Sequence, residues 1–103
     1  MDRETINKVV VTDANELFLG LESNGKSMYQ YIYREASGVY WDENYHGFKS
    51  TPLKEWSHSK WFSHIVSLVK SSLGVELQLS KKATWCNIPE HERKVIVHEH
   101  VAI

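Results

Sequence analysis

Residues 57–74, SHSKWFSHIVSLVKSSLG, place their apolar side chains at the spacing of one helix face. At about 100° per residue these side chains fall within an arc of roughly 160°; they are Trp61, Phe62, Ile65, Val66, Leu68, Val69 and Leu73. Ser57 suits the N-cap, Gly74 suits the C-terminal end, and Lys70 complements the negative end of the helix dipole. Because so wide an apolar arc needs an apolar layer beneath it, the sequence predicts a helix from about Ser57 to Leu73 lying on a sheet.

Two segments with alternating character flank a turn signal upstream of this helix. Glu16–Glu22 reads ELFLGLE, Lys26–Arg34 reads KSMYQYIYR, and Asn24-Gly25 between them favours a type I′ hairpin turn. In the register that such a turn sets, the leucines of the first strand share a face with Met28 and Ile32. The opposite face collects the aromatic residues, with the last of them joining from a third strand: Phe18, Tyr29, Tyr31, Tyr33 and Tyr40. The sequence therefore predicts a hairpin that is aliphatic toward the helix and aromatic on its other face.

The remaining segments complete the predicted sheet. Strands are predicted where residues alternate or favour β structure: Ile6–Thr12, Val39–Asp42, Phe48–Thr51, Val75–Ser80 and Thr84–Ile88. Lys81-Lys82 is predicted as a turn and Thr51-Pro52 as a helix entry. Asn87-x-x-Glu90 resembles a capping box, which predicts a second helix from about Pro89 to Glu99. The alternative for this end is a strand across KVIVHEHVAI, because its valines and isoleucines favour β structure.

These elements predict an α+β fold in a single domain, residues 1–103. We expect an antiparallel sheet of about five to six strands, one long amphipathic helix and a short C-terminal helix.

Charge and cysteine content narrow the function classes. Twelve basic and thirteen acidic side chains nearly cancel, which argues against a nucleic-acid-binding protein with a basic stripe. Cys86 is the only cysteine, so the sequence forms no internal disulfide and a reducing, cytoplasmic location is expected. No apolar run approaches the roughly 18 residues of a membrane span, and the first residues lack the apolar core of a signal peptide.

No catalytic motif stands out in the chain, and we predict no catalytic residue and no cofactor. His98-Glu99-His100 has the spacing of some metal ligands on a strand, whereas on a helix the two imidazoles point about 160° apart. A solvated terminal segment is the favoured interpretation, so no metal site is predicted. Cys86 is expected to be a small buried residue, since nothing in the sequence positions a base beside it.

A polar group in a predicted turn next to the aromatic residues is the candidate mouth of a pocket: Trp41, Asp42, Glu43 and His46.

The predicted aromatic face is the strongest functional signal, because leaving it in water costs several kcal/mol, about 150–250 Å² of surface for each ring. The rest of the chain, a second copy, or a foreign protein or small apolar molecule are the three candidate covers. We expect a non-enzymatic binding protein that self-associates through this face. The first alternative is an immunity-type protein that neutralises a partner toxin, and the second is a small enzyme with a histidine and a carboxylate beside the aromatic cluster. Neither nucleic acid nor membrane is an expected partner.

The run YQYIYREASGVYWDENYHGFKSTP, followed by EWSHSKWFSHIV, resembles a group of small proteins encoded on integron gene cassettes. The likeness spans most of the chain and lies in general sequence character. It implies a short bacterial α+β protein carried on a mobile element, and many members of the group form homo-oligomers. It assigns no catalytic residue to any position of this chain.

Overall fold

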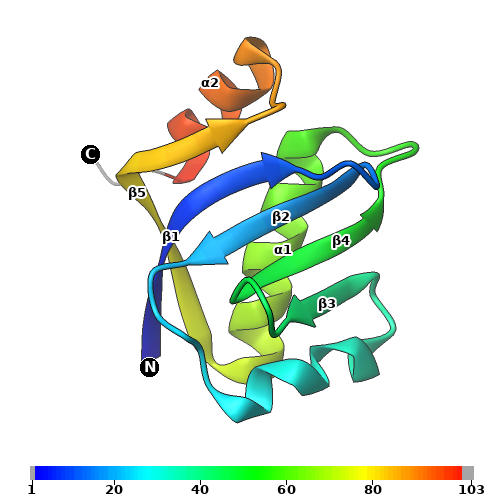
Figure 1. The fold of residues 1–103 in the computed structure, drawn as a ribbon, viewed down its shortest axis with the longest axis vertical. Coiled ribbons are helices and arrows are strands. Elements are labelled where there is room, and N and C mark those ends of the chain that lie inside the picture. Colours follow the sequence, from blue (N-terminus) through cyan, green and yellow to red (C-terminus); the bar gives the residue numbers. More distant parts are fainter. Residues whose placement is uncertain (1, 101–103) are drawn as a thin grey trace.

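The structure, a computed structural model, describes residues 2–100. In chain order the elements are β1 (Asp2–Val11), β2 (Glu16–Leu21), the 3-10 helix η1 (Ser27–Glu35), β3 (Val39–Asp42), β4 (Gly47–Pro52), α1 (His58–Leu73), β5 (Val75–Cys86) and α2 (Glu90–His100). The strands form one five-stranded sheet in the order β3-β4-β2-β1-β5 (Figure 1). Every pair is antiparallel except β1 with β5, which run parallel. The predicted α+β class is confirmed, with its long helix and a C-terminal helix.

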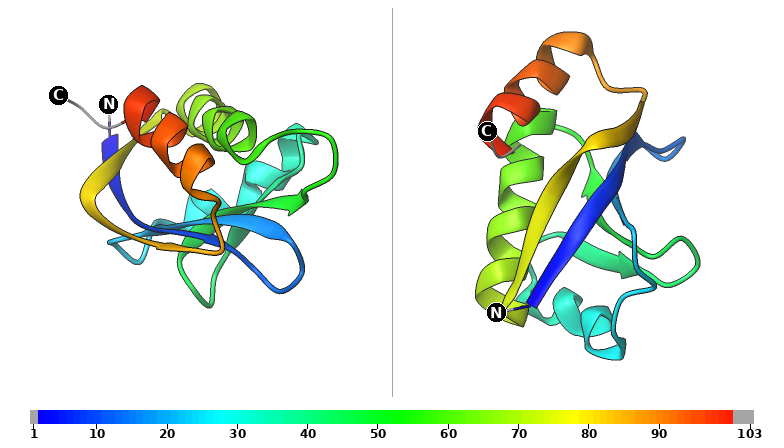
Figure 2. Two further views of the ribbon diagram at one scale, coloured as in Figure 1. Left: turned by 90° about the horizontal axis from the view of Figure 1, so that it is seen from above. Right: turned by 90° about the vertical axis from the view of Figure 1, so that its left-hand side faces the viewer.

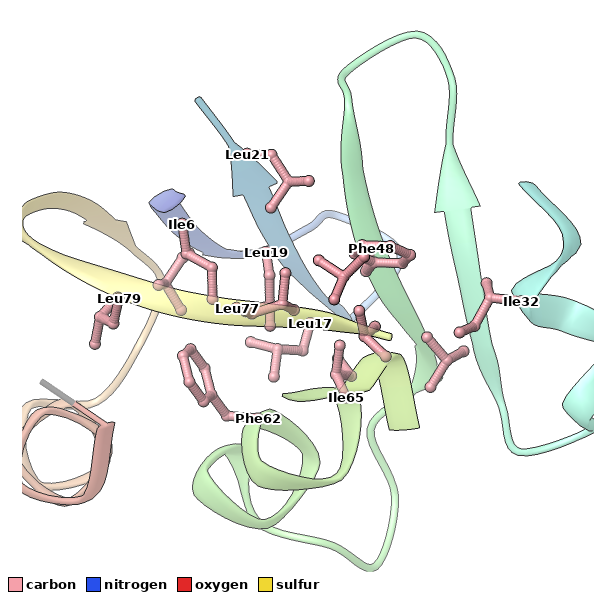
Figure 3. Close-up of a cluster of buried hydrophobic side chains, with 14 of the residues drawn as sticks. Ile6, Leu17, Leu19, Leu21, Ile32, Phe48, Phe62, Ile65, Leu77 and Leu79 are labelled. Atoms are coloured by element: carbon pink, nitrogen blue, oxygen red, sulfur yellow. The ribbon is translucent and has the colours of Figure 1, made fainter. Parts of the chain in front are cut away.

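The helices α1 and α2 lie on the same side of the sheet, so the molecule has one layer of helix and one of strand (Figure 2). Alternate residues of the strands point into the space between the layers, where Leu17 and Leu19 of β2 are fully buried. From the other side Phe62 and Ile65 of α1 project into the same space (Figure 3). The predicted apolar face of the helix is thus confirmed as a wall of the core.

The ends of α1 are those that the sequence predicts. The side chain of Ser57 accepts a hydrogen bond from the backbone N–H of Lys60 at 3.2 Å, which satisfies one of the free donors of the first turn. Gly74 ends the helix in the left-handed region, with φ of 68°, and its N–H donates to the carbonyl of Lys70.

The predicted strand over Lys26–Arg34 is wrong, and with it the predicted hairpin. Residues 27–35 form the 3-10 helix η1, in which three residues make one turn. Tyr29 and Ile32 are three positions apart, so they share the face that packs into the core, and both are buried. A type I′ turn needs positive φ at both central residues, but Gly25 has it and Asn24 does not.

In place of the hairpin strand, β4 lies beside β2. The register pairs Phe18 with Lys49 and Gly20 with Gly47, and it shifts near Glu16, which pairs with Pro52. At the shift the N–H of Leu17 donates to the buried hydroxyl of Ser50 at 3.0 Å. The predicted helix entry at Thr51-Pro52 is therefore wrong, because these residues end a strand instead.

The last strand is longer than expected. Val75–Cys86 is a single strand, whereas two strands with a turn at Lys81-Lys82 were predicted. Along β1 the register pairs Ile6 with Leu79 and then Lys8 with Thr84. One residue of β1 thus lies opposite four residues of β5, so the interruption is a large bulge inside one strand.

The C-terminal helix is confirmed over the described part of that segment, and the strand alternative is wrong for residues 94–100; residues 101–103 of that alternative lie outside the described residues. Glu92, Ile96 and His100 recur every four positions, and this stripe faces α1. Glu92 accepts a hydrogen bond from the backbone N–H of Ser59 at 3.0 Å, so a carboxylate of α2 lies at the positive end of α1. Within residues 2–100, no helix is both long and apolar enough to cross a bilayer.

Candidate functional site

The candidate site is the side of the sheet that faces away from α1 and α2, here called the open face (Figure 2). It is defined by the outward side chains of four adjacent strands: Lys8 and Val10 of β1, Phe18 of β2, Lys49 of β4, and Tyr40 and Asp42 of β3. Tyr45, in the turn between β3 and β4, extends this surface. Most of these residues line a shallow hollow with a volume of about 490 Å³.

Phe18 forms the floor of the hollow because two glycines leave room for its ring. A Cβ atom placed on Gly47 would lie 2.5 Å from the ring of Phe18, and one placed on Gly20 would lie 3.0 Å from it. The ring therefore lies flat across β2 and β4, and the side chain is only 8% exposed. A larger residue at either glycine would push the ring upward and close the hollow.

Charges of both signs surround this floor. The ammonium group of Lys49 lies 4.0 Å from a carboxylate oxygen of Glu16 and 3.8 Å from Oδ2 of Asp42. The other oxygen of Asp42, Oδ1, accepts hydrogen bonds from the backbone N–H groups of Asn44 and Tyr45 at 2.9 and 3.1 Å. Asp42 therefore holds the turn with one oxygen and presents the second to the open face.

The structure divides the predicted aromatic face among three environments, so the single face built from one hairpin is wrong. Phe18 and Tyr40 do lie on the open face. Tyr29 is in the core, in contact with the rings of Trp41 and Phe48. The remaining two, Tyr31 and Tyr33, are exposed on η1, where the guanidinium of Arg34 lies 4.3 Å from the ring centre of Tyr31. An interface role for Tyr31 and Tyr33 stays a prediction that competes with the open face, where Tyr40 is the exposed member beside Phe18.

Tyr29 has a structural role that the predicted hairpin did not indicate. Its hydroxyl donates to Oε2 of Glu4 at 2.6 Å, and the hydroxyl of Ser23 donates to Oε1 of the same carboxylate at 2.6 Å. Burial, reinforced by the bond to Glu4, raises the pKa of Tyr29 well above its ordinary value, so the phenol stays neutral. This residue ties η1 to β1.

The predicted pocket group lies at the end of β3 and in the turn that follows it, and both of its carboxylates make local hydrogen bonds there. The indole N–H of Trp41 donates to Oε2 of Glu43 at 2.8 Å. The backbone N–H of His46 donates to the carbonyl of Asp42 at 2.8 Å, and His46 has a positive φ of 57°. Its Nδ1 atom is buried without a hydrogen-bond partner among the described residues, so no acid–base pair with a neighbouring carboxylate is formed through that atom. The geometry supports a turn that shapes the rim of the open face.

The other candidates for chemistry are dispersed. His98 and His100 lie on α2 two positions apart and so point to different sides of the helix. The Nε2 atom of His100 is 2.9 Å from the hydroxyl of Ser63, and burial lowers the pKa of this imidazole. No group of three histidine, cysteine or acidic residues within residues 2–100 is arranged to hold a metal ion. Cys86, expected to be buried, is exposed at the end of β5.

Sequence reasoning missed the lysines and Val10 as parts of the site, because it paired β2 with the wrong segment. The alternation of Lys8 and Val10 with buried Val9 and Val11 is the signal that marks an outward face on β1.

Sequence reasoning also missed a cluster beside the start of α1, in which the rings of Trp56 and Trp61 lie 4.8 Å apart. His64 joins this cluster, and its Nε2 is 3.0 Å from the carbonyl of Ser37.

Comparisons with known proteins point to one group. A family model described as Integron Cassette Protein Hfx_Cass5 matches residues 6–83, which include every residue that defines the open face. A solved structure, the integron cassette protein Hfx_Cass5 from the mobile metagenome of the North West Arm sewage outfall, is similar at 30% sequence identity over 95% of each chain, with a TM-score of 0.44. The search of curated proteins found no match.

Proposed function

The chain belongs to the Hfx_Cass5 family of integron cassette proteins, as the family model that matches residues 6–83 shows, and we propose that it is a binding protein that self-associates through the open face. One observation carries this proposal. The sheet has its helices on one side, and on the other side a shallow, mainly apolar hollow has the largely buried ring of Phe18 in its lining.

The composition of the open face supports contact with another protein surface. Tyr40 is 43% exposed and Tyr45 is 75% exposed, and tyrosine is favoured at interfaces because a large ring is combined with a hydroxyl that can reach water. Two sheets pack face to face at about 10 Å, a separation that side chains from both faces fill. A net charge of −1 gives little repulsion between copies.

The mixture of charges weakens the immunity-type alternative. Blocking a cationic toxin favours a face with acidic residues alone. Here Lys8 and Lys49 share the face with Glu16 and Asp42.

Two matched variants test the proposal. Tyr40→Ala removes an exposed ring from the open face, and Tyr33→Ala removes one of similar exposure, 52%, from η1. We expect sedimentation equilibrium to show a self-associating wild-type protein. Tyr40→Ala should weaken association about tenfold, or about 1–2 kcal/mol, while Tyr33→Ala leaves it unchanged.

A wild-type chain that stays monomeric at high concentration would overturn the proposal. Weakening by Tyr33→Ala alone would move the contact to η1 and also contradict it. Circular dichroism of each variant shows whether a loss of association is a loss of folding.

A further inference from the structure

Two rows of residues cross the open face, and each has a regular order set by the strand registers. The first row runs Lys8, Gly20, Gly47, Asp42 across β1, β2, β4 and β3. The second row, one pleat further along β1, runs Val10, Phe18, Lys49, Tyr40 across the same strands. Figure 1 shows the order of these strands in the sheet.

The first row has a property that matters for pairing with a copy of itself. It carries a positive charge at one end, a negative charge at the other, and two glycines between them. Its midpoint is the boundary between β2 and β4, where the ring of Phe18 lies over both glycines. Consider a two-fold axis that runs parallel to the strands, between two docked sheets and over this midpoint. Rotation about it exchanges the ends of the row, so each charge meets the opposite charge of the other copy.

We propose, on the premise that the chain self-associates through the open face, that a second copy docks face to face about this axis. Lys8 of each copy then pairs with Asp42 of the other. The same operation sets Val10 opposite Tyr40 of the other copy and Phe18 opposite Lys49 of the other copy. The ring of Phe18 lies near the axis in each copy.

The dimensions of packed sheets allow these pairs. Lys8 and Asp42 lie three strand spacings apart, about 14 Å, so each is about 7 Å from the axis. Packed sheets are rotated by about 30°, which displaces such a pair by only about 4 Å. The flexible stem of a lysine spans that displacement across a gap of about 10 Å.

The side chains concerned are placed for this contact. The first atoms of the Lys8 side chain lie beside Gly20, since Cβ and Cδ come within 3.1 and 3.6 Å of the position of a Cβ there. Oδ1 of Asp42 is occupied by the turn, whereas Oδ2 lies 3.8 Å from the ammonium group of Lys49, so in the dimer this oxygen is shared between Lys49 and the incoming Lys8. The intermolecular pair therefore needs no hydrogen bond of the turn to break.

A double-mutant cycle separates this arrangement from other dimers. Lys8→Glu places like charges opposite each other at two symmetric contacts and should weaken association at least tenfold at low salt. Asp42→Asn keeps an amide oxygen for the turn but removes the charge, and Lys8→Glu/Asp42→Asn should recover the part of the loss that comes from like-charge repulsion. Within one copy the two positions are too far apart to couple, so their effects on monomer unfolding should add. Lys82→Glu, at an exposed position in the bulge of β5, controls for the change in net charge.

Spin labels on the native Cys86 supply an independent distance. Cys86 pairs with Val10 at the outer strand, so the proposed axis sets the two labelled positions roughly 25 Å apart. This distance together with coupling in the dissociation constant supports the inference. A dimer with additive effects, or with labels closer than about 15 Å, overturns it while leaving self-association intact. A monomeric protein overturns both.

Discussion

At the scale of single residues, Tyr29 and Phe18 show how a hydroxyl group decides the place of an aromatic side chain. Tyr29 is fully buried, yet its hydroxyl has a carboxylate partner in Glu4. Phe18 has no polar atom to satisfy and lies flat over two glycines on the other side of the sheet. A buried polar group without a partner costs about 1–3 kcal/mol, so the position of Glu4 is what allows a tyrosine in the core.

Tyr29→Phe tests this pair through pH. At neutral pH we expect the variant to lose about 1–3 kcal/mol of unfolding free energy. The pKa of Tyr29 is raised in the folded state from the ordinary 10.0, so above about pH 10 the unfolded chain loses a proton that the folded chain keeps. The wild type should then lose stability as the pH rises, and its advantage over the variant should shrink.

Urea unfolding of both proteins at several pH values between 7 and about 11 measures this difference. An advantage that stays constant across the range would show that the phenol of Tyr29 does not titrate differently in the two states.

At the scale of elements, an element was predictable when all of its local sequence signals indicate the same structure. α1 was predicted well because its apolar spacing, Ser57 and Gly74 all indicate the same helix. η1 was missed because its tyrosines recur every second residue, as on a strand, while Tyr29 and Ile32 also fit a three-residue period. Packing decides between the two periods, because Tyr29 contacts Trp41 of β3 and Phe48 of β4, partners that the local sequence of η1 does not reveal.

The contact of α2 with the start of α1 gives a second prediction. Glu92 accepts from the N–H of Ser59 and lies 3.7 Å from His58, whereas Glu90 is on the solvent side with Lys94. Glu92→Ala should reduce the free energy of unfolding by about 1–2 kcal/mol, because the first turn of α1 loses a charged acceptor.

Glu90→Ala is the matched control and should change stability by less than about 0.5 kcal/mol. Chemical denaturation of both variants decides the matter. Equal losses would mean that Glu92 contributes no more than a surface charge.

At the scale of the whole molecule, the strand order is what sequence reasoning did not reach. Pairing of β2 with β4 and of β1 with β5 joins segments far apart in the chain, and alternation within a strand does not specify its neighbour. The fold class and the two helices on a sheet were predictable, as was the position of Phe18 and Tyr40 on the same face of the sheet. The two rows of residues on the open face, with Lys8 and Asp42 at the ends of the first row, follow from the order of the strands and were not predictable.

The proposed self-association also predicts a property of the whole molecule in thermal unfolding. If two folded copies bind and unfolded chains do not, the melting temperature rises with protein concentration. We expect scanning calorimetry at concentrations below and above the dissociation constant to show this rise in the wild type and a smaller one in Tyr40→Ala. A melting temperature independent of concentration would speak against a dimer of folded copies.

The parallel pairing of β1 with β5 has a consequence for synthesis. A ribosome completes β1, β2, β3, β4 and α1 before the residues that close the outer edge of β1 leave the exit tunnel. During that interval the backbone amides of the nascent β1 are open to any neighbouring chain. The timing of translation of the residues that follow α1 therefore governs how long the growing polypeptide is exposed to misassembly.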